Sequence, residues 1–321
     1  MIDFSIWMPI VLSFGLTAII APMVIPFLVK LKFGQFVRDD GPESHLKKAG
    51  TPTMGGIIFL AGIVLTSIVF AWKYPAIIPV AFMTVGFGII GFIDDYLKVV
   101  KKQSEGFKPM QKMFGQLIVT LAFIVYYYKV ADLGSEIRIP FTDGMMITMP
   151  TWLFIIFVLF VVLGTVNGTN FTDGLDGLAS SVTIIVAGFF LVASMKLWPE
   201  IAPINGAVMG ALMGFLLYNT HPAKVFMGDT GSLALGGYVA GIAIMLKLPL
   251  FIVIVGMIYL IEVLSVILQV GYFKLTHGKR IFKMAPIHHH FELSGFKETQ
   301  VVSMFTIITV ILCILGLIAL K

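Results

Sequence analysis

Five aspartates in this chain stand at the ends of long apolar segments, where carboxylates are rarely found. Asp94 and Asp95 lie in GFIDDYLK, Asp173 and Asp176 in NFTDGLDGLA, and Asp229 in FMGDTGS. Because a charge near hydrocarbon is energetically costly, this many acids at such positions favour a functional role over a structural one. Carboxylate oxygens are the ligands that hard divalent cations prefer. The sequence therefore predicts a site for a divalent cation and a phosphate.

The first acidic motif is Asp94-Asp95-x-x-Lys98, at the end of an expected helix. On a helix, Asp94 and Lys98 share a face because they are four residues apart, and Asp95 points about 100° away. The acid pair can hold Mg²⁺ through oxygen, and Lys98 can contact a phosphate. The alternative is a solvated helix end with one ion pair. The three further aspartates expected on the same side of the membrane favour the metal site.

The second motif, NGTNFTDGLDGLA, begins at Asn167. We expect Thr172 to cap the next apolar helix, with Asp173 in its first turn, where a helix N-terminus favours a phosphate. On such a helix, Asp173 and Asp176 lie on one face because they are three residues apart. The spacing does not match a calcium-binding loop. A glycine- and aspartate-rich turn is the structural alternative, but it does not explain two acids beside a membrane helix.

The third motif is VFMGDTGS, in which Asp229 offers a further metal ligand. Gly228 and Gly231 allow close approach of the backbone, and Phe226 is interpreted either as a stacking surface for a base or as support for the loop. The sequence has no phosphate-binding P-loop, and no dinucleotide fingerprint stands between a strand and a helix.

Two further motifs carry histidines and lysines. In APIHHHFE, the run His288–His290 is interpreted as contacting phosphate or base or as transferring a proton. Zinc is disfavoured, because zinc sites draw ligands from separated positions and no cysteine is near. Before TPTMGG, Lys48 is available to a phosphate. Glu262 lies midway along an apolar segment, where an acid is a functional candidate or bonds to another helix, and both interpretations stay open.

Composition sets the class of protein that must hold these residues. The chain has 321 residues, of which 58% are hydrophobic and 12% charged, with a net charge of +5. A soluble domain would carry about twice that share of charge, so we expect one integral-membrane domain over residues 1–321. The excess of basic residues in cytoplasmic loops explains the positive net charge, so no nucleic-acid partner is needed to account for it. The one cysteine, Cys313, cannot form an internal disulfide.

A hydrocarbon core of about 30 Å needs about 20 apolar residues per helix, which predicts an all-α polytopic protein. About ten spans are expected, at 5–30, 53–72, 75–97, 113–130, 151–166, 172–194, 201–218, 231–247, 250–273 and 299–320. The fifth is short. The connection at 130–150 contains alternating residues and a TDG turn, which predict a small hairpin.

Lysine and arginine are divided unequally between alternate loops. Sixteen of the 22 fall on the side that carries the five aspartates and all six histidines, and six fall on the other. Cytoplasmic loops carry the excess of basic residues. We therefore expect the acidic face to be cytoplasmic and both termini to lie outside.

The five motifs TPTMGG, GFIDDYLK, NGTNFTDGLDGLA, VFMGDTGS and APIHHHFE, in this order, resemble those of the phospho-N-acetylmuramoyl-pentapeptide transferases. This family belongs to the polyprenyl-phosphate N-acetylhexosamine-1-phosphate transferases. The resemblance covers the whole chain. It implies a helical enzyme of the bacterial inner membrane, usually a homodimer, with a cytoplasmic site that requires Mg²⁺. The implied reaction moves phospho-MurNAc-pentapeptide from its UDP donor to undecaprenyl phosphate, which gives UMP and lipid I for peptidoglycan synthesis.

The resemblance also implies roles for individual residues. Asp94, Asp95 and Asp229 match the catalytic and metal-binding acids, and His288 matches an essential histidine. A further set matches positions that line the nucleotide-sugar pocket: Lys48, Lys112, Asn170, Asp173, Asp176, Asn219, Phe226 and His289.

Two alternative functions remain at this point. A related transferase would move GlcNAc-1-phosphate onto the same lipid, but APIHHHFE favours the muramyl-pentapeptide branch. An ion-coupled transporter would place acids near the middle of the membrane. Only Glu262 is expected there, whereas five aspartates gather at one face.

Overall fold

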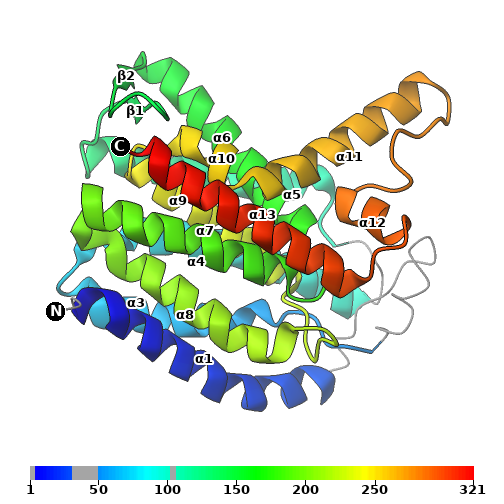
Figure 1. Ribbon diagram of the computed structural model, residues 1–321. Helices are drawn as coiled ribbons and strands as arrows, with labels where there is room; N and C mark the ends of the chain where they lie inside the picture. Colours follow the sequence, from blue (N-terminus) through cyan, green and yellow to red (C-terminus); the bar gives the residue numbers. More distant parts are fainter. Residues whose placement is uncertain (1–3, 31–49, 102–105) are drawn as a thin grey trace.

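The computed structural model describes residues 4–30, 50–101 and 106–321, which are almost entirely helical. The long helices are α1 (Phe4–Lys30), α3 (Gly56–Ala71), α4 (Ile78–Lys101), α5 (Pro109–Lys129), α6 (Thr151–Thr172), α7 (Leu178–Leu197), α8 (Ala202–Asn219), α9 (Gly228–Met245), α11 (Met257–Leu275) and α13 (Glu298–Ala319) (Figure 1). The short elements are η1 (Pro75–Ile77), β1 (Glu136–Arg138), β2 (Met146–Thr148), η2 (Pro199–Ile201), η3 (Pro249–Phe251), α10 (Ile252–Val255) and α12 (Ile287–Glu292).

The helices have the length and composition of membrane spans. Within the described residues, eight helices are long and apolar enough to cross a membrane. The two other expected spans correspond to α3, which has 16 residues, and to α9, which has 18 and is buried over almost its whole length. The prediction of an all-α polytopic membrane protein is confirmed, and each of the ten expected segments matches a helix.

The largest differences from the expected boundaries lie at α6, α7 and the ninth segment. Helix α6 continues to Thr172 instead of ending at 166, and within this extra length the hydroxyls of Thr169 and Thr172 donate to carbonyls one turn earlier, which satisfies these polar groups inside the helix. Helix α7 consequently begins only at Leu178. The ninth segment is broken at Gly256, between α10 and α11.

Helix α9 forms the centre of the bundle. Every residue from Thr230 to Met245 is buried, and α3, α4, α6 and α7 pack around it. Large apolar side chains such as Ile19, Phe160 and Ile311 are instead exposed on the outer helices. In a soluble monomer such extensive apolar exposure is rare, whereas lipid requires it. The outer surface is therefore suited to a bilayer.

The two ends of the bundle differ in chemistry. Both termini lie at the same end (Figure 1). All four tryptophans lie at this end too, because successive long helices run in opposite directions. Trp7 and Trp152 are near the starts of α1 and α6, and Trp72 and Trp198 follow the ends of α3 and α7. Tryptophan is enriched where membrane meets water. The tryptophans therefore mark one interface, and the opposite end of the bundle carries the aspartates of α4 and α9.

The expected hairpin is also at the terminal end. Strands β1 and β2 pair antiparallel, with Glu136 opposite Thr148. Lys247 donates to Glu136 at 2.7 Å, and this hydrogen bond holds the pKa of the exposed Glu136 carboxyl below its usual value. The hairpin prediction is confirmed.

A buried polar network fastens three of the inner helices. Asn205 donates to the Ser194 hydroxyl at 2.7 Å and accepts from the Tyr238 hydroxyl at 2.6 Å. We expect Asn205→Ala to lower the free energy of unfolding by about 1–3 kcal/mol, because it leaves buried polar groups without partners. Thermal unfolding in detergent measures the loss, with the exposed Ser303→Ala as control. Equal midpoints in the two variants would contradict the expectation.

Candidate active site

Two helices from distant parts of the sequence bring three carboxylates together. Asp94 and Asp95 are on α4, and Asp229 is in the first turn of α9. The helices approach closely because Gly91 has no side chain: a Cβ there would overlap the backbone of Asp229 and Thr230. Small residues at helix contacts permit such approach.

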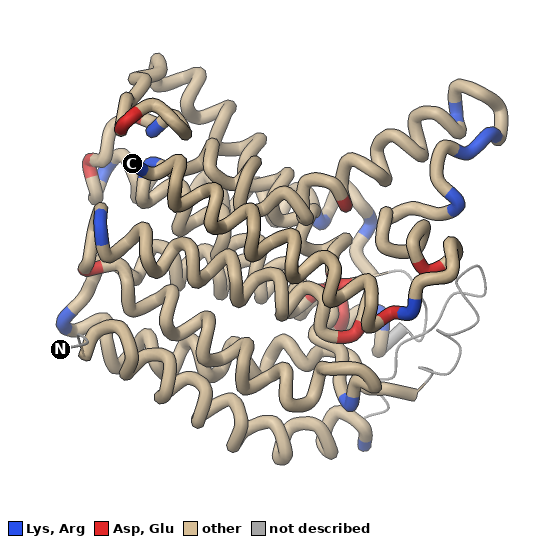
Figure 2. The backbone as a smooth tube through the Cα atoms, viewed as in Figure 1, with Lys and Arg blue, Asp and Glu red and all other residues tan. Residues whose placement is uncertain are grey.

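One oxygen from each of Asp94, Asp95 and Asp229 lies within 4.8 Å of the others. Asp94 and Asp95 are each 3% exposed, and the side chain of Asp229 is 17% exposed. These acids are therefore not the solvated helix end that was the structural alternative. Figure 2 shows interior acidic residues gathered at the end of the bundle opposite the termini.

Two lysines lie among the three carboxylates. The Lys98 ammonium is 2.7 Å from Asp94 and 2.8 Å from Asp229, and the Lys112 ammonium is 2.9 Å from Asp229. Each positive charge offsets the repulsion between the acids. The motif reasoning assigned Lys98 only a phosphate contact, although its i,i+4 spacing from Asp94 already placed it near the acids. Both lysines are positioned to meet an anion that approaches the cluster.

The two acids of the pair have different surroundings. Asp95 accepts hydrogen bonds from the backbone N–H groups of Asp229 at 3.2 Å and Thr230 at 2.9 Å, and from the Thr230 hydroxyl at 2.7 Å. A carboxylate at a helix N-terminus is favourable, so Asp95 fastens α4 to the start of α9. Asp94 accepts from the backbone N–H of Phe107 at 2.6 Å and otherwise faces Lys98.

Helix α6 completes the surroundings of Asp229. The Asn170 amide donates to Asp229 and to the Ser232 hydroxyl, both at 2.8 Å. The sequence singled out Asn170 through its motif. Ser232 was not singled out, since nothing in its local pattern marks it. With Lys112 and Asn170 beside it, Asp229 is held from two further helices.

The loop before α9 is fastened to the TPTMGG segment by backbone hydrogen bonds. The N–H of Phe226 donates to the Pro52 carbonyl at 2.8 Å, and the Phe226 carbonyl accepts from Gly55 at 2.8 Å. Asn219 donates to the Val225 carbonyl at 3.0 Å, so its amide supports the same loop. Lys48 lies outside the described residues.

The segment after α6 differs from the expectation. Thr172 is the last residue of α6, and Asp173 follows it, so the prediction that Thr172 caps the next helix is wrong. The Thr172 hydroxyl donates to the Gly168 carbonyl at 2.8 Å, within α6, so it does not cap the next helix. Helix α7 instead begins after Gly177, whose φ of +75° suits glycine. Asp173 and Asp176 therefore lie in a turn, not on a helix face.

Asp176 connects this turn to two other segments. Its carboxylate is buried and lies 3.0 Å from His221 Nδ1, and it accepts from the Ala223 N–H at 3.1 Å. Its own N–H donates to Glu298 of α13 at 2.7 Å. Asp176, His221 and Glu298 form a second group with ligand atoms within 4.8 Å. Their mutual contacts brace the turn and the loop before α9.

The histidine motif folds into the protein as α12. His288 is 1% exposed, and its Nδ1 lies 3.1 Å from both oxygens of Glu262 on α11. The other ring nitrogen, Nε2, lies against Gly174 in the turn after α6. His289 is 2.9 Å from Glu292 within α12. His288 is therefore buried in the protein and does not lie in a polar surface loop.

The donor set of the acidic cluster fits a hard divalent cation. All three groups are carboxylates, and Mg²⁺ prefers oxygen ligands. Lys98 and Lys112 lie close enough to contact phosphate oxygens of a reactant bound at the same place. The arrangement can therefore bind a metal–diphosphate group at one end of the bundle.

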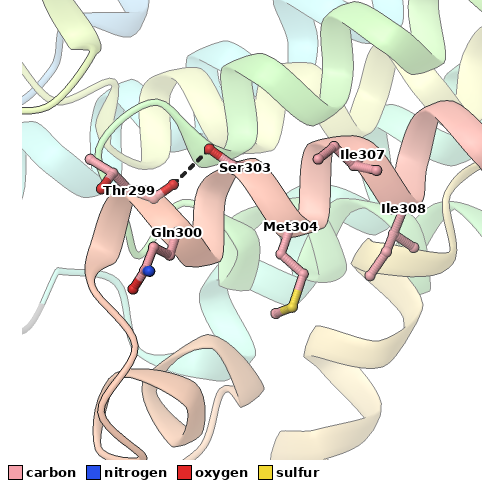
Figure 3. Close-up of a pocket in the computed structure, with 6 residues that line it drawn as sticks. All are labelled: Thr299, Gln300, Ser303, Met304, Ile307 and Ile308. Atoms are coloured by element: carbon pink, nitrogen blue, oxygen red, sulfur yellow. Dashed lines mark hydrogen bonds between the residues drawn. The ribbon is translucent and has the colours of Figure 1, made fainter.

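A groove of about 490 Å³ lies elsewhere, along α13 (Figure 3). It is lined by residues of that helix alone, including Met304, Ile307 and Ile308, and it contains no acid, lysine or histidine. Its chemistry is that of an apolar surface, so it does not compete with the acidic cluster as a reaction centre.

Comparisons with known proteins show the family of this chain. The glycosyl transferase family 4 model matches residues 77–247, and a signature of phospho-N-acetylmuramoyl-pentapeptide-transferase matches residues 48–60. A protein of that name from Acetivibrio thermocellus is 54% identical over 97% of this chain and 94% of its own length. Proteins of the same name from Alkaliphilus oremlandii and Caldicellulosiruptor bescii are 52% and 48% identical, with 97% or more of both chains covered in each case.

Proposed function

The chain belongs to the family of phospho-N-acetylmuramoyl-pentapeptide transferases, and from that premise we propose the reaction that it catalyses. It transfers phospho-MurNAc-pentapeptide from UDP-MurNAc-pentapeptide to undecaprenyl phosphate, giving lipid I and UMP. The observation that carries this proposal is the convergence of Asp94, Asp95 and Asp229 with Lys98 and Lys112 at one end of a membrane bundle. Both reactants are phosphates, one of them anchored in lipid.

The cluster of Asp94, Asp95 and Asp229 is proposed to hold Mg²⁺, since its donor set suits that ion. When bound, Mg²⁺ supplies charge neutralisation and polarisation of the phosphorus–oxygen bonds. Asp229 has the most exposed carboxylate of the three, and in the structure Lys98 and Lys112 pair with it. Asp95 contributes chiefly by fixing Asp229 through the start of α9.

The chain's own residues then position two phosphates for in-line displacement. An oxygen of the lipid phosphate forms a bond to the sugar-linked phosphorus, and the bond from that phosphorus to the UMP oxygen breaks, with the electron pair leaving on UMP. Lys98 and Lys112 offset the charge of the attacking and leaving phosphates. Asp94 orients the acceptor from beside Lys98.

The nucleotide sugar is proposed to bind over the segments that surround the cluster. These are the turn with Asp173 and Asp176, the loop with Asn219 and Phe226, and α12 with His288 and His289. Hydrogen bonds already join the first two segments, which supports one continuous pocket. Lys48, Lys112 and Asn170 are assigned to the same pocket.

We place the enzyme in the bacterial inner membrane as one catalytic domain, a homodimer with its site on the cytoplasmic face and both termini outside. The excess of Lys and Arg in the loops on the acidic side supports this orientation. The apolar tail of the acceptor would remain in the bilayer while its phosphate reaches the cluster.

Metal removal tests the proposal directly. Purified protein with UDP-MurNAc-pentapeptide and polyprenyl phosphate is expected to release UMP, and excess EDTA is expected to lower the rate by at least about 100-fold because charge neutralisation is lost. Added Mg²⁺ should restore it. UMP release that is unaffected by EDTA would exclude the metal, and absence of release with both substrates would exclude the reaction.

The UDP-sugar that supports formation of the lipid product distinguishes this reaction from its alternatives. Lipid product formed from UDP-GlcNAc but not from UDP-MurNAc-pentapeptide would assign the chain to the related GlcNAc-1-phosphate transferases. Solute movement across vesicles without UMP release would indicate a transporter.

A further inference from the structure

Glu262 and His288 form a buried pair, and the proposed function above gives Glu262 no role. Glu262 is 0% exposed on α11, and His288 is 1% exposed on α12. The pair joins two elements that are separated by an exposed loop. A buried carboxylate is costly unless it is paired, so its retention beside an imidazole calls for a reason.

The contact fixes the orientation of the imidazole ring. Nδ1 of His288 is 3.1 Å from each oxygen of Glu262, so the ring nitrogen faces the middle of the carboxylate. We assign the donor role in this contact to Nδ1, because the two Glu262 oxygens are acceptors, and the ring-nitrogen signals described below test this assignment. A flip of the ring would remove this hydrogen bond, and the bond therefore selects one of the two ring orientations.

The opposite nitrogen is left for another molecule. Among the described residues, Nε2 of His288 is buried without a hydrogen-bond partner. It points to the turn after α6, where a Cβ on Gly174 would overlap it. That turn follows Asn170, which donates to Asp229 in the acidic cluster. Nε2 thus lies against the turn that carries Asp173 and Asp176, to which the proposed function assigns the nucleotide sugar.

We propose that Glu262 is a positioning residue, which holds His288 so that Nε2 faces the bound nucleotide sugar. This role rests on the proposed function. It explains why an acid lies inside an apolar helix and why Gly174 has no side chain. For histidines that bind metals, the partner of the other ring nitrogen is commonly worth about 10–100-fold in affinity or activity, and we expect a loss of similar size here.

The test compares Glu262→Gln with Glu136→Gln, an equal change on the hairpin at the opposite end. Turnover of Glu262→Gln is expected to fall about 10–100-fold, with the detergent unfolding midpoint nearly unchanged, while Glu136→Gln keeps wild-type turnover. Wild-type turnover in Glu262→Gln would overturn the proposal.

A second measurement reports the protonation of the His288 ring nitrogens and does not depend on enzyme turnover. Nitrogen-15 labelling of the histidine rings reports which ring nitrogen is protonated, and the His288 signals are those lost in His288→Gln. We expect Nδ1 protonation in the wild type and altered His288 signals in Glu262→Gln, because a glutamine amide can donate as well as accept. Unchanged His288 signals would overturn the proposal even if turnover fell.

Two controls separate the possible failures. If the wild type releases no UMP, the proposed function fails, whereas the nitrogen signals still test the Glu262–His288 pairing. If Glu262→Gln does not fold, Glu262→Asp replaces it, since it keeps the charge and withdraws the carboxylate by one methylene. Full turnover with unchanged His288 signals in that variant would likewise overturn the proposal.

Discussion

Asp229→Asn is expected to lower UMP release by about 1000-fold or more while leaving the protein inserted and folded. Asparagine keeps the shape of the side chain, but it removes the negative charge that Lys98 and Lys112 approach to within 2.9 Å. The expected effect is large because the lost charge would be a ligand of the proposed Mg²⁺ and also orders the two lysines. Steady-state UMP release at saturating substrates measures it.

Asp94→Asn and Asp95→Asn are expected to impair turnover nearly as much, but Asp95→Asn should also lower the unfolding midpoint. Asp95 accepts from the first turn of α9, and an amide cannot accept with both of its polar atoms. The matched control is Asp143→Asn on the exposed hairpin, which should retain wild-type turnover. Wild-type turnover in all three site variants would remove the site assignment.

Gly91→Ala is expected to reduce turnover by about 100-fold although residue 91 carries no chemical group. The added methyl would overlap the backbone of Asp229 and Thr230, so α4 and α9 must separate. Separation moves Asp94 and Asp95 away from Asp229, and a displacement of about 1 Å in a reactive site is enough for a loss of that size. The overlap should also cost about 1–3 kcal/mol of stability.

Gly164→Ala is the control for this variant. Gly164 is also in a long helix, but nothing lies within 4 Å of the position its Cβ would take. Alanine there should leave turnover unchanged and favour the helix slightly. If Gly91→Ala and Gly164→Ala have equal turnover, the close approach of α4 and α9 does not set the geometry of the site.

Two Glu–His contacts, His289–Glu292 and His288–Glu262, differ in whether the sequence could predict them. His289 and Glu292 are three residues apart on α12, so helical spacing alone makes their contact plausible. His288 and Glu262 are 26 residues apart on different helices. Reasoning from the sequence marked both residues but had no means to pair them, because the intervening loop allows many arrangements.

The sequence by itself determined that this is a helical membrane protein and approximately where its helices lie. These properties depend on hydropathy and charge along the chain, which are local. It also marked the five aspartates, yet only the tertiary structure decided that Asp94, Asp95 and Asp229 form one cluster while Asp176 braces a neighbouring turn. The reason is physical: which carboxylates meet depends on how closely helices pack, and at Gly91 that distance is set by the absence of a single side chain.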